Sequence, residues 1–238
     1  MKTLVIFGAG PGLGVATARR FGREGFRIAL VSRNAGRLGS FVDELAADGS
    51  EAAAFPAELG DRGTHDGVVA AITERFGSID VAVINGFLDF SAARPVLDID
   101  VESMQTVLDG TVLAPLSLVR LVLPGMIDRG DGALLFGLGA SAKNPMPPLA
   151  GPGSGQASLR NYIHNLNVEL ADKGVYAGAL TIGVLIEKSD AQHAYDSNPD
   201  LAHGLEIERV EPADLAERYW AMYTKRERAE ELAGAIAQ

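Results

Sequence analysis

The glycine-rich stretch from Gly8 to Gly14 is the part of the sequence whose residue types and spacing point most directly to chemistry. It reads Gly-Ala-Gly-Pro-Gly-Leu-Gly, follows the apolar run Leu4 to Phe7 and opens the amphipathic segment Val15 to Arg23. Glycine permits positive φ and close backbone approach to a phosphate, and the free N–H groups at a helix N-terminus attract the anion. The stretch predicts a dinucleotide-phosphate site, against the alternative of a tight strand-to-helix connection without a ligand.

A second signal stands at Val31-Ser32-Arg33-Asn34, where the next apolar run ends. An NAD site usually has an acidic residue here, which accepts a hydrogen bond from the ribose 2′-hydroxyl. The small Ser32 instead leaves room for a 2′-phosphate, and the cationic Arg33 can neutralise it. The sequence therefore favours NADP(H) over NAD(H), unless Arg33 is an ordinary exposed arginine after a strand.

Apolar runs and amphipathic segments alternate along the chain. Six runs are predicted to be strands: Lys2–Phe7, Arg27–Val31, Ala52–Phe55, Asp80–Ile84, Ala133–Leu138 and Val175–Ile182. Five segments with helical spacing lie between or after them: Gly12–Arg23, Ala35–Ala47, Thr64–Phe76, Val101–Met126 and Ser154–Ala171. This alternation predicts an α/β fold, a Rossmann-type doubly wound parallel sheet flanked by helices, in one domain spanning residues 1–238.

Two stretches leave alternatives open. Residues 81–88 contain Asn-Gly, which favours a type I′ turn, so they can form a hairpin instead of one strand. Residues 187–209 are polar and without sustained periodicity, and are either a loop that covers the ligand crevice or a plain surface loop. After them, Pro212 is placed to start a last helix.

Composition limits the classes of partner. The net charge of −10 offers no basic face for nucleic acid or an anionic membrane, and no uninterrupted run of 18 apolar residues occurs. The chain has no cysteine, which excludes disulfides and thiolate sites, and no His or carboxylate spacing predicts a metal site. The N-terminus enters a strand without a leader pattern. We therefore expect a soluble, cytoplasmic protein.

The chain resembles the short-chain dehydrogenase/reductase family over nearly its whole length. Gly8, Gly12 and Gly14 match the family's Thr-Gly-x-x-x-Gly-x-Gly pattern, with Phe7 in place of the threonine. Softer matches follow at Glu58-Leu59, at Ile84-Asn85-Gly86-Phe87 and at Ile182-Gly183, which stand where the family has Asp-Val, Asn-Asn-Ala-Gly and Pro-Gly. Together with the residues above, the resemblance implies these cofactor contacts: Gly8, Gly10, Gly12, Leu13, Gly14, Ser32, Arg33, Asn34, Glu58, Leu59, Asn85, Gly86, Gly183 and Val184.

The family's catalytic signature, Tyr-x-x-x-Lys, is absent. The five tyrosines are 162, 176, 195, 219 and 223, and none has lysine four residues on. Matching Asn165 to Leu170 with the end of the family's catalytic helix places Pro152 at the tyrosine, Gln156 at the lysine, Gly139 at the serine and Thr111 near the asparagine. The stretch Gly151 to Gly155 is rich in helix breakers, so we expect the helix to begin near Ser154, with Ser154 as its N-cap.

Four polar residues are candidates for a substitute catalytic group. Ser141 and Lys143 follow the fifth strand, beside the position expected for the nicotinamide, and Gln156 and Thr111 keep polar side chains. Other polar groups are expected to be structural or solvated: Tyr162, His164, Glu187, Lys188 and His65, the last on a helix face remote from the crevice.

The resemblance implies an NADP(H)-dependent oxidoreductase that reduces a small or medium hydrophobic substrate with a non-standard catalytic site. The alternative is a catalytically silent NADP(H)-binding regulatory or scaffold protein. The helices Val101–Met126 and Ser154–Ala171 correspond to those through which family members assemble, so we expect a homodimer or homotetramer.

Overall fold

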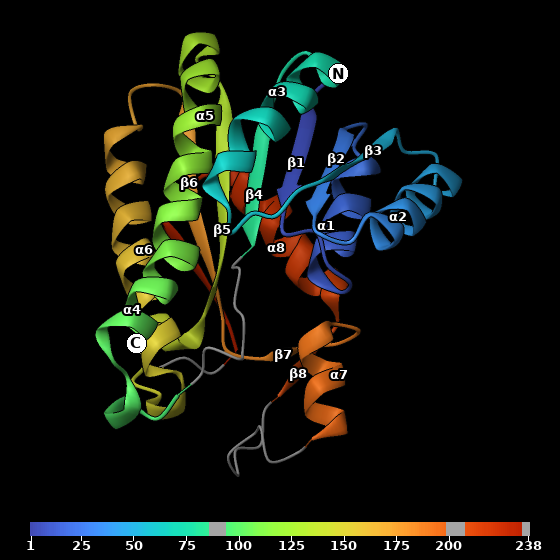
Figure 1. The fold of residues 1–238 in the computed structure, drawn as a ribbon. Helices are drawn as coiled ribbons and strands as arrows, with labels where there is room; N and C mark the ends of the chain where they lie inside the picture. The colour runs from blue at the N-terminus through green and yellow to red at the C-terminus, as the bar shows by residue number, and fades with distance from the viewer. Residues whose placement is uncertain (86–93, 199–207, 235–238) are drawn as a thin grey trace.

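The computed structural model describes residues 1–85, 94–198 and 208–234. Seven parallel strands form one twisted sheet in the order β3-β2-β1-β4-β5-β6-β9 (Figure 1). Their bounds are β1 Thr3–Phe7, β2 Arg27–Ser32, β3 Ala52–Pro56, β4 Val81–Asn85, β5 Gly132–Gly139, β6 Val175–Ile182 and β9 Glu230–Ala233. The chain order reverses between β1 and β4, which confirms the doubly wound fold class.

Helices cover both faces of the sheet, and each face has its own buried hydrophobic cluster. One face carries α1 Leu13–Gly22, α2 Ala35–Ala47 and α8 Pro212–Lys225. The other carries α3 His65–Phe76, α5 Ala114–Arg129 and α6 Ala150–Glu169, with α4 Val101–Leu108 leading into α5. The inner strands β1, β4, β5 and β6 are almost wholly buried, as expected for a parallel sheet enclosed between two helical layers, whereas the edge strands β3 and β9 are mostly half-buried or exposed.

The expected start of α6 at Ser154 is wrong. The helix begins at Ala150, and the Ser154 hydroxyl donates to the Ala150 carbonyl at 2.8 Å instead of capping. Pro152 lies in the first turn, where its missing N–H breaks no helical bond. The glycines meet long-range neighbours: a Cβ on Gly153 would lie 2.9 Å from the Ser141 carbonyl oxygen, and one on Gly155 would overlap the Thr111 hydroxyl.

Three further expectations need correction. The segment Val101–Met126 is not one regular helix, because a π-helical turn at Asp109–Leu113 separates α4 from α5. The edge strand β9 was not anticipated at all. Residues 187–209 are not simply irregular, because α7 spans Asp190–Ser197 in their described part. The short strand β7 Leu185–Ile186, just before them, pairs in parallel with β8 Arg209–Val210 at their end.

The hairpin alternative for residues 81–88 does not fit β4. This strand pairs in parallel with β1 on one side and β5 on the other, so a hairpin partner has no free edge. Residues 86–88 of that alternative lie outside the described residues. Pro212 does occupy the first turn of α8, as predicted.

The helical stretch Val101–Arg129 is the one part of the described chain that is long and apolar enough to cross a membrane by length and composition. Of its most apolar window, 39% is buried inside the protein. The stretch packs on α3, β5 and α6, which accounts for much of its apolar character.

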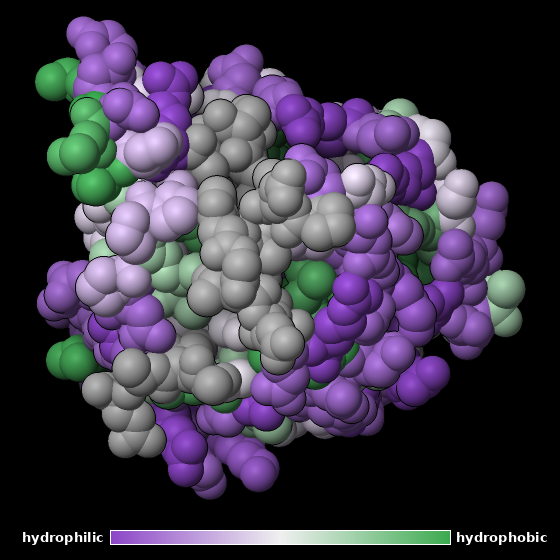
Figure 2. Space-filling view, turned by 90° about the horizontal axis from the view of Figure 1, so that it is seen from below, coloured by the Kyte–Doolittle hydropathy of each residue, from purple (hydrophilic) through white to green (hydrophobic). Residues whose placement is uncertain are grey.

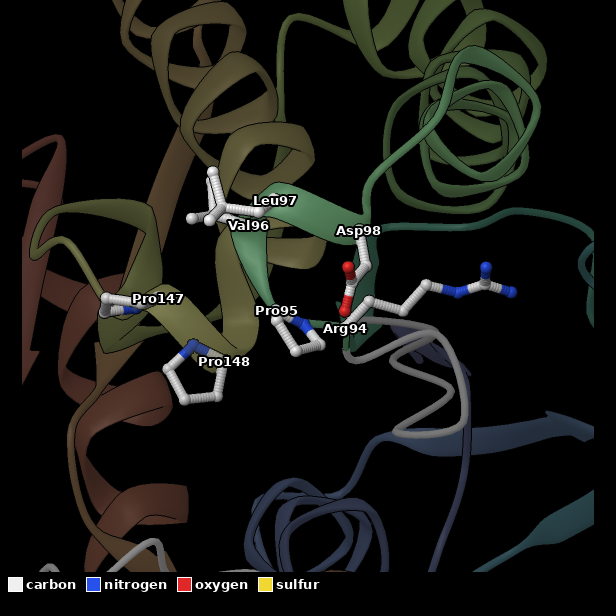
Figure 3. Close-up of a pocket in the computed structure, with 7 residues that line it drawn as sticks. All are labelled: Arg94, Pro95, Val96, Leu97, Asp98, Pro147 and Pro148. Carbon is white, nitrogen blue, oxygen red and sulfur yellow. The ribbon is translucent and has the colours of Figure 1, made fainter.

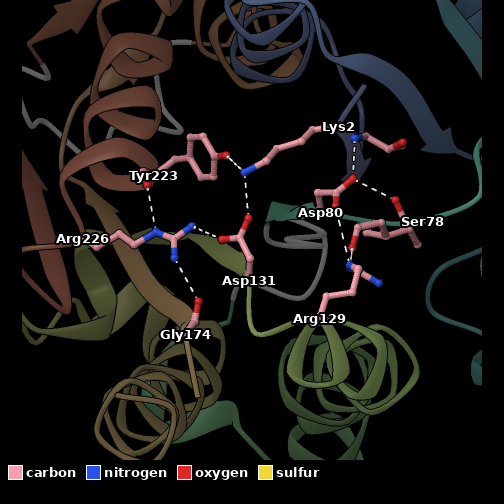
Figure 4. A network of polar contacts seen from close by, with 10 residues as sticks. Lys2, Ser78, Asp80, Arg129, Asp131, Gly174, Tyr223 and Arg226 are labelled. Carbon is pink, nitrogen blue, oxygen red and sulfur yellow. Dashed lines mark hydrogen bonds and ion pairs between the residues drawn. The ribbon is translucent and has the colours of Figure 1, made fainter. Parts of the chain in front are cut away.

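A polar network ties together the amino ends of the strands, at the end of the sheet opposite the glycine turn (Figure 4). Asp131, before β5, accepts from Lys2 at 2.8 Å and from Arg226 at 2.9 Å. Lys2 also donates to the Tyr223 hydroxyl at 2.8 Å. Burial alone raises the pKa of Asp131, but the hydrogen bonds from Lys2 and Arg226 outweigh it and lower the pKa. This network joins Lys2 and the end of α8 to the start of β5, and the carboxyl end of the sheet is left for a site.

Candidate functional site

The glycine turn after β1 is held tightly against β2. The backbone N–H groups of Gly8 and Ala9 both donate to the Val31 carbonyl, at 3.0 and 2.9 Å. Gly8 and Gly12 have φ of 87° and 77°, a region that favours glycine. Gly12 is the N-cap of α1 and offers no side-chain cap. The Val15 N–H donates to the Gly10 carbonyl at 3.2 Å, so the N–H groups of Leu13 and Gly14 are the ones left for an anion at this helix end.

Two further glycines show what the turn is shaped for. A Cβ on Gly14 would lie 3.2 Å from the Ala9 Cα, so Gly14 permits the close packing of α1 on the turn. A Cβ on Gly10 would meet no atom of the described chain within 4 Å. The backbone at Gly10 therefore faces open space, which is the approach that a pyrophosphate needs.

A cleft of about 960 Å³ opens at the carboxyl end of the sheet. Figure 2 views the molecule from this side, where hydrophilic residues cover much of the visible surface and hydrophobic ones protrude near one edge. The cleft is lined by several residues expected to contact the cofactor: Gly8, Gly10, Ser32, Arg33, Asn34, Glu58 and Leu59. Thr111 and Pro152, which the sequence analysis matched to catalytic positions, line it too. Residues of the glycine turn thus share one cavity with Thr111 and Pro152, which lie more than 100 positions further along the chain.

The remaining expected cofactor residues lie elsewhere. Leu13 and Gly14 are buried beneath the turn. Gly183 donates its N–H to the Ala233 carbonyl at 2.8 Å, and Val184 lines a separate cavity of about 330 Å³ between β8 and α8. Gly86 lies outside the described residues.

Asn85 is engaged from the opposite face of the sheet. Its Oδ1 accepts from the hydroxyl of the fully buried Tyr219 of α8 at 3.0 Å. Burial raises the pKa of Tyr219 far above its usual range, so this phenol stays protonated as a donor. A structural partner of Asn85 was not visible in the sequence, because it lies 134 residues away.

Two arginines stand at the mouth of the cleft, each beside an acid. The Arg33 side chain is 79% exposed, and its Nε lies 3.6 Å from Glu58 Oε2. Arg37, in the first turn of α2, donates to Asp190 of α7 at 2.7 Å. Asn34 caps α2, because its Oδ1 accepts from the Arg37 N–H at 2.9 Å. Both arginines can reach an anion at this end, and sequence reasoning found only the first.

Gly139 and Gln156, which the sequence analysis matched to two catalytic positions, are hydrogen-bonded to each other. The Gly139 N–H donates to Gln156 Oε1 at 2.7 Å. A backbone N–H can only donate, so the amide oxygen must face Gly139 and the Nε2 group must face away. Gln156 is 2% exposed, and within the described residues its buried Nε2 has no hydrogen-bond partner. An orphaned buried donor of this kind fits a missing ligand oxygen, although neither Gln156 nor Gly139 lines the cleft.

The other catalytic candidates differ in how available they are. The Thr111 hydroxyl donates to the Val107 carbonyl at 2.7 Å within the π-helical turn, and is not a free acid. Ser141 lies in the 3-10 turn η5 Ala140–Ala142, against Gly153. Lys143 is half-buried and does not line the cleft. None of the five tyrosines lines the cleft either.

Lys143 instead contributes to a polar cluster beneath β9. Arg160 of α6 forms two hydrogen bonds with Glu230, at 2.8 and 2.5 Å, and Thr181 donates to the same carboxylate at 2.7 Å. Burial alone raises the pKa of Glu230, but these hydrogen bonds and the charges of Arg160 and Lys143 lower it to about 2. His164 Nε2 lies 3.5 Å from the same carboxylate.

The remaining polar residues expected to be structural or solvated are placed as follows. Glu187 pairs with Arg209 at 3.7 Å and Lys188 with Glu211 at 2.8 Å, on the surface formed by β7, β8 and α7. Tyr162 is half-buried and packs against the core, which raises the pKa of its hydroxyl. Among the residues that the structure describes, no cluster can hold a metal ion.

The chain is similar to known dehydrogenases. A family model described as short chain dehydrogenase matches residues 2–198. A short chain dehydrogenase of Pseudocercospora fijiensis is 28% identical over 184 residues, which cover 76% of this chain and 59% of that protein. A fatty acyl-CoA reductase of Mycobacterium tuberculosis is 28% identical over 205 residues, covering 84% and 69%.

Solved structures show the same fold. Actinorhodin polyketide ketoreductase with NADPH superposes with a TM-score of 0.85 at 22% identity, over 99% of this chain and 96% of that one. YwfH, an NADPH dependent reductase involved in bacilysin biosynthesis, reaches 0.87 at 17% identity, over 100% and 98%. Given the match over residues 2–198, the chain belongs to the short-chain dehydrogenase family of oxidoreductases.

Proposed function

We propose that this protein is an NADP(H)-dependent reductase whose site lacks the usual proton donor. One observation carries the proposal: a single cleft joins the glycine turn, the Ser32-Arg33 corner and the replaced catalytic positions Thr111 and Pro152. The open space at Gly10 and the unpartnered Gln156 Nε2 fit a bound dinucleotide. The ketoreductase structure contains NADPH and YwfH is an NADPH dependent reductase, which supports the choice of cofactor.

The residues that would hold NADP(H) follow from the cleft. Gly8, Gly10 and the start of α1 would bind the pyrophosphate, and Arg33 would pair with the 2′-phosphate. Leu59 and its neighbours would flank the adenine. When bound, NADPH supplies a hydride to the substrate.

Proton transfer is the step that this chain handles differently. Hydride addition to a ketone leaves an alkoxide that must be protonated, and the side chains of Gly139 and Pro152 carry no proton to give. Gln156 Nε2 is a neutral donor that can hold an oxygen but cannot release a proton to it. Substrates that need no enzymatic acid fit best: an iminium ion, an activated alkene, or a ketone with its own internal acid.

An apolar hollow beside the cleft supports a hydrophobic substrate. It measures about 480 Å³ and is lined by Pro95, Val96 and Leu97 of the turn before α4 and by Pro147 and Pro148 before α6 (Figure 3). Arg94 lines both this hollow and the cleft, so the two adjoin. The relative named as a fatty acyl-CoA reductase is consistent with an apolar substrate.

The second candidate is a silent NADP(H) binder, and the Gly139 and Pro152 replacements favour it. In both cases we propose a cytoplasmic homodimer or homotetramer acting with small molecules, not with nucleic acid or membranes.

NADPH oxidation across a panel of ketones, imines and enones separates the two candidates. Turnover of any member supports the reductase. Tight NADPH binding by calorimetry with no turnover at all supports the silent binder, and no binding refutes both.

A further inference from the structure

His65 is the first residue of α3 and is completely buried. Both of its ring nitrogens are hydrogen-bonded. Nε2 lies 3.0 Å from the Leu59 carbonyl oxygen, and Nδ1 lies 3.0 Å from Ser117 Oγ of α5. The ring therefore bridges a loop after β3 and a core helix.

The two partners determine how the ring is protonated. A carbonyl oxygen only accepts, so Nε2 must carry the hydrogen and donate to Leu59. In the neutral ring Nδ1 then accepts from the Ser117 hydroxyl, which can turn to donate. An apolar side chain at this position would leave the Leu59 carbonyl without that donor in a buried setting.

The loop that His65 reaches is one wall of the cleft. Its residues Ala57, Glu58, Leu59 and Gly60 all line the cavity, on the same side as Arg33. Other bonds fix the rest of its backbone: Ala57 N–H donates to the Ser32 carbonyl at 3.1 Å, and Thr64 Oγ1 donates to the Glu58 carbonyl at 2.9 Å. His65 completes this set at Leu59.

We propose that His65 is a positioning residue for the adenine half of the cofactor. It does not touch the ligand. By holding the Leu59 carbonyl it keeps the loop 57–60 in the shape that receives the adenosine, and Ser117 holds the ring in turn. The proposal rests on the NADP(H) function above, and it adds a connection to the cleft to the structural role expected for His65.

Two amide variants separate the two hydrogen bonds. The Nε2 of His65→Gln can replace the imidazole Nε2 and reach Leu59, whereas the shorter amide of His65→Asn reaches only the Ser117 side. His65→Leu removes both bonds, and Ser117→Ala removes only the support behind the ring. Calorimetry would measure the binding of NADPH, of adenosine 2′,5′-bisphosphate for the adenine half, and of reduced nicotinamide mononucleotide for the other half.

We expect His65→Leu and His65→Asn to weaken the binding of NADPH and of the bisphosphate by about three- to tenfold, the range for one lost hydrogen bond. His65→Gln should bind both close to wild type, and Ser117→Ala should lie between. Reduced nicotinamide mononucleotide should bind wild type and all four variants with the same affinity. If His65→Leu does not fold, His65→Asn makes the same test.

Equal losses for both halves of the cofactor would show a merely structural role and overturn the proposal, as would unchanged binding in His65→Asn. A His65→Gln variant as weak as His65→Asn would do the same. If wild type binds neither NADPH nor the bisphosphate, both the NADP(H) function and this proposal are refuted. If wild type binds them and the variants match it, only the role of His65 falls.

Discussion

The Gly139 N–H donates to the amide oxygen of Gln156 at 2.7 Å, which joins the end of β5 to the first turns of α6. Both residues were matched to catalytic positions in the sequence analysis, and here they are bonded to each other through the amide oxygen alone. The arrangement leaves a fixed, neutral donor, Nε2, and no acid.

Two substitutions of Gln156 should separate the role of its amide oxygen from the role of its Nε2 group. Gln156→Leu leaves the Gly139 N–H without its acceptor and should lower the free energy of unfolding by about 1–3 kcal/mol. Gln156→Glu keeps an acceptor for Gly139 but loses the Nε2 donor, so it should bind NADPH more weakly than wild type. Denaturant unfolding and calorimetry measure the two effects. Equal NADPH binding by Gln156→Glu and wild type would exclude Nε2 as a cofactor contact.

Arg33 should decide the choice of cofactor. A guanidinium that pairs with a 2′-phosphate contributes roughly 1.5–3 kcal/mol, or about ten- to a hundredfold in affinity. Arg33→Ala should therefore weaken NADPH far more than NADH. Glu58→Gln is the matched control, because it removes the acid 3.6 Å from Arg33 and should strengthen NADPH binding. Equal losses for both cofactors in Arg33→Ala would refute the NADP assignment.

Assembly should bury apolar side chains that this chain leaves exposed. Val101 of α4 and Val168 of α6 are 79% and 77% exposed. Val101→Asp combined with Val168→Asp should shift the protein toward monomer in light scattering at micromolar concentration, whereas Ala70→Asp on the exposed face of α3 should not. A wild-type monomer at this concentration would contradict the expected homo-oligomer.

The Glu230 cluster predicts how stability changes with pH. The pKa of Glu230 is about 2 in the folded protein against 4.5 for an ordinary glutamate, so its contribution is present above pH 4.5 and is lost as pH falls toward 2. Glu230→Gln should remove about 2–3 kcal/mol of stability at pH 7 and much less near pH 2. Unfolding followed by the fluorescence of Trp220, the one tryptophan, tests this. A loss that is the same at both pH values would assign the effect to packing.

The sequence predicted the features whose causes are local. The apolar runs and the turn at Gly8 each depend on neighbouring residues, and the structure has both. What sequence reasoning missed depends on distant partners. The strand β9 begins with Glu230-Glu231, so its sequence looks polar. Glu230 can lie in the strand because Arg160, 70 residues away, donates hydrogen bonds to its carboxylate.

The start of α6 was missed for the same kind of reason. Glycines that break helices in isolation here permit contact with Ser141 and Thr111. The partnership of Gly139 with Gln156, 17 residues apart, could not be inferred from either residue type.

The loss of the usual acid should produce a difference in reduction rate between two classes of substrate. General acid catalysis contributes about a hundred- to ten-thousandfold, roughly 3–5 kcal/mol of barrier, so ketones should be reduced very slowly. Preformed iminium ions of matched shape need no proton in the hydride step and should be reduced far faster with NADPH. Lys143→Ala should leave this ratio unchanged, because Lys143 lies toward Glu230 and does not line the cleft. A ratio near one, or rapid oxidation of simple secondary alcohols with a pH profile of an essential tyrosine, would show that an acid is present after all.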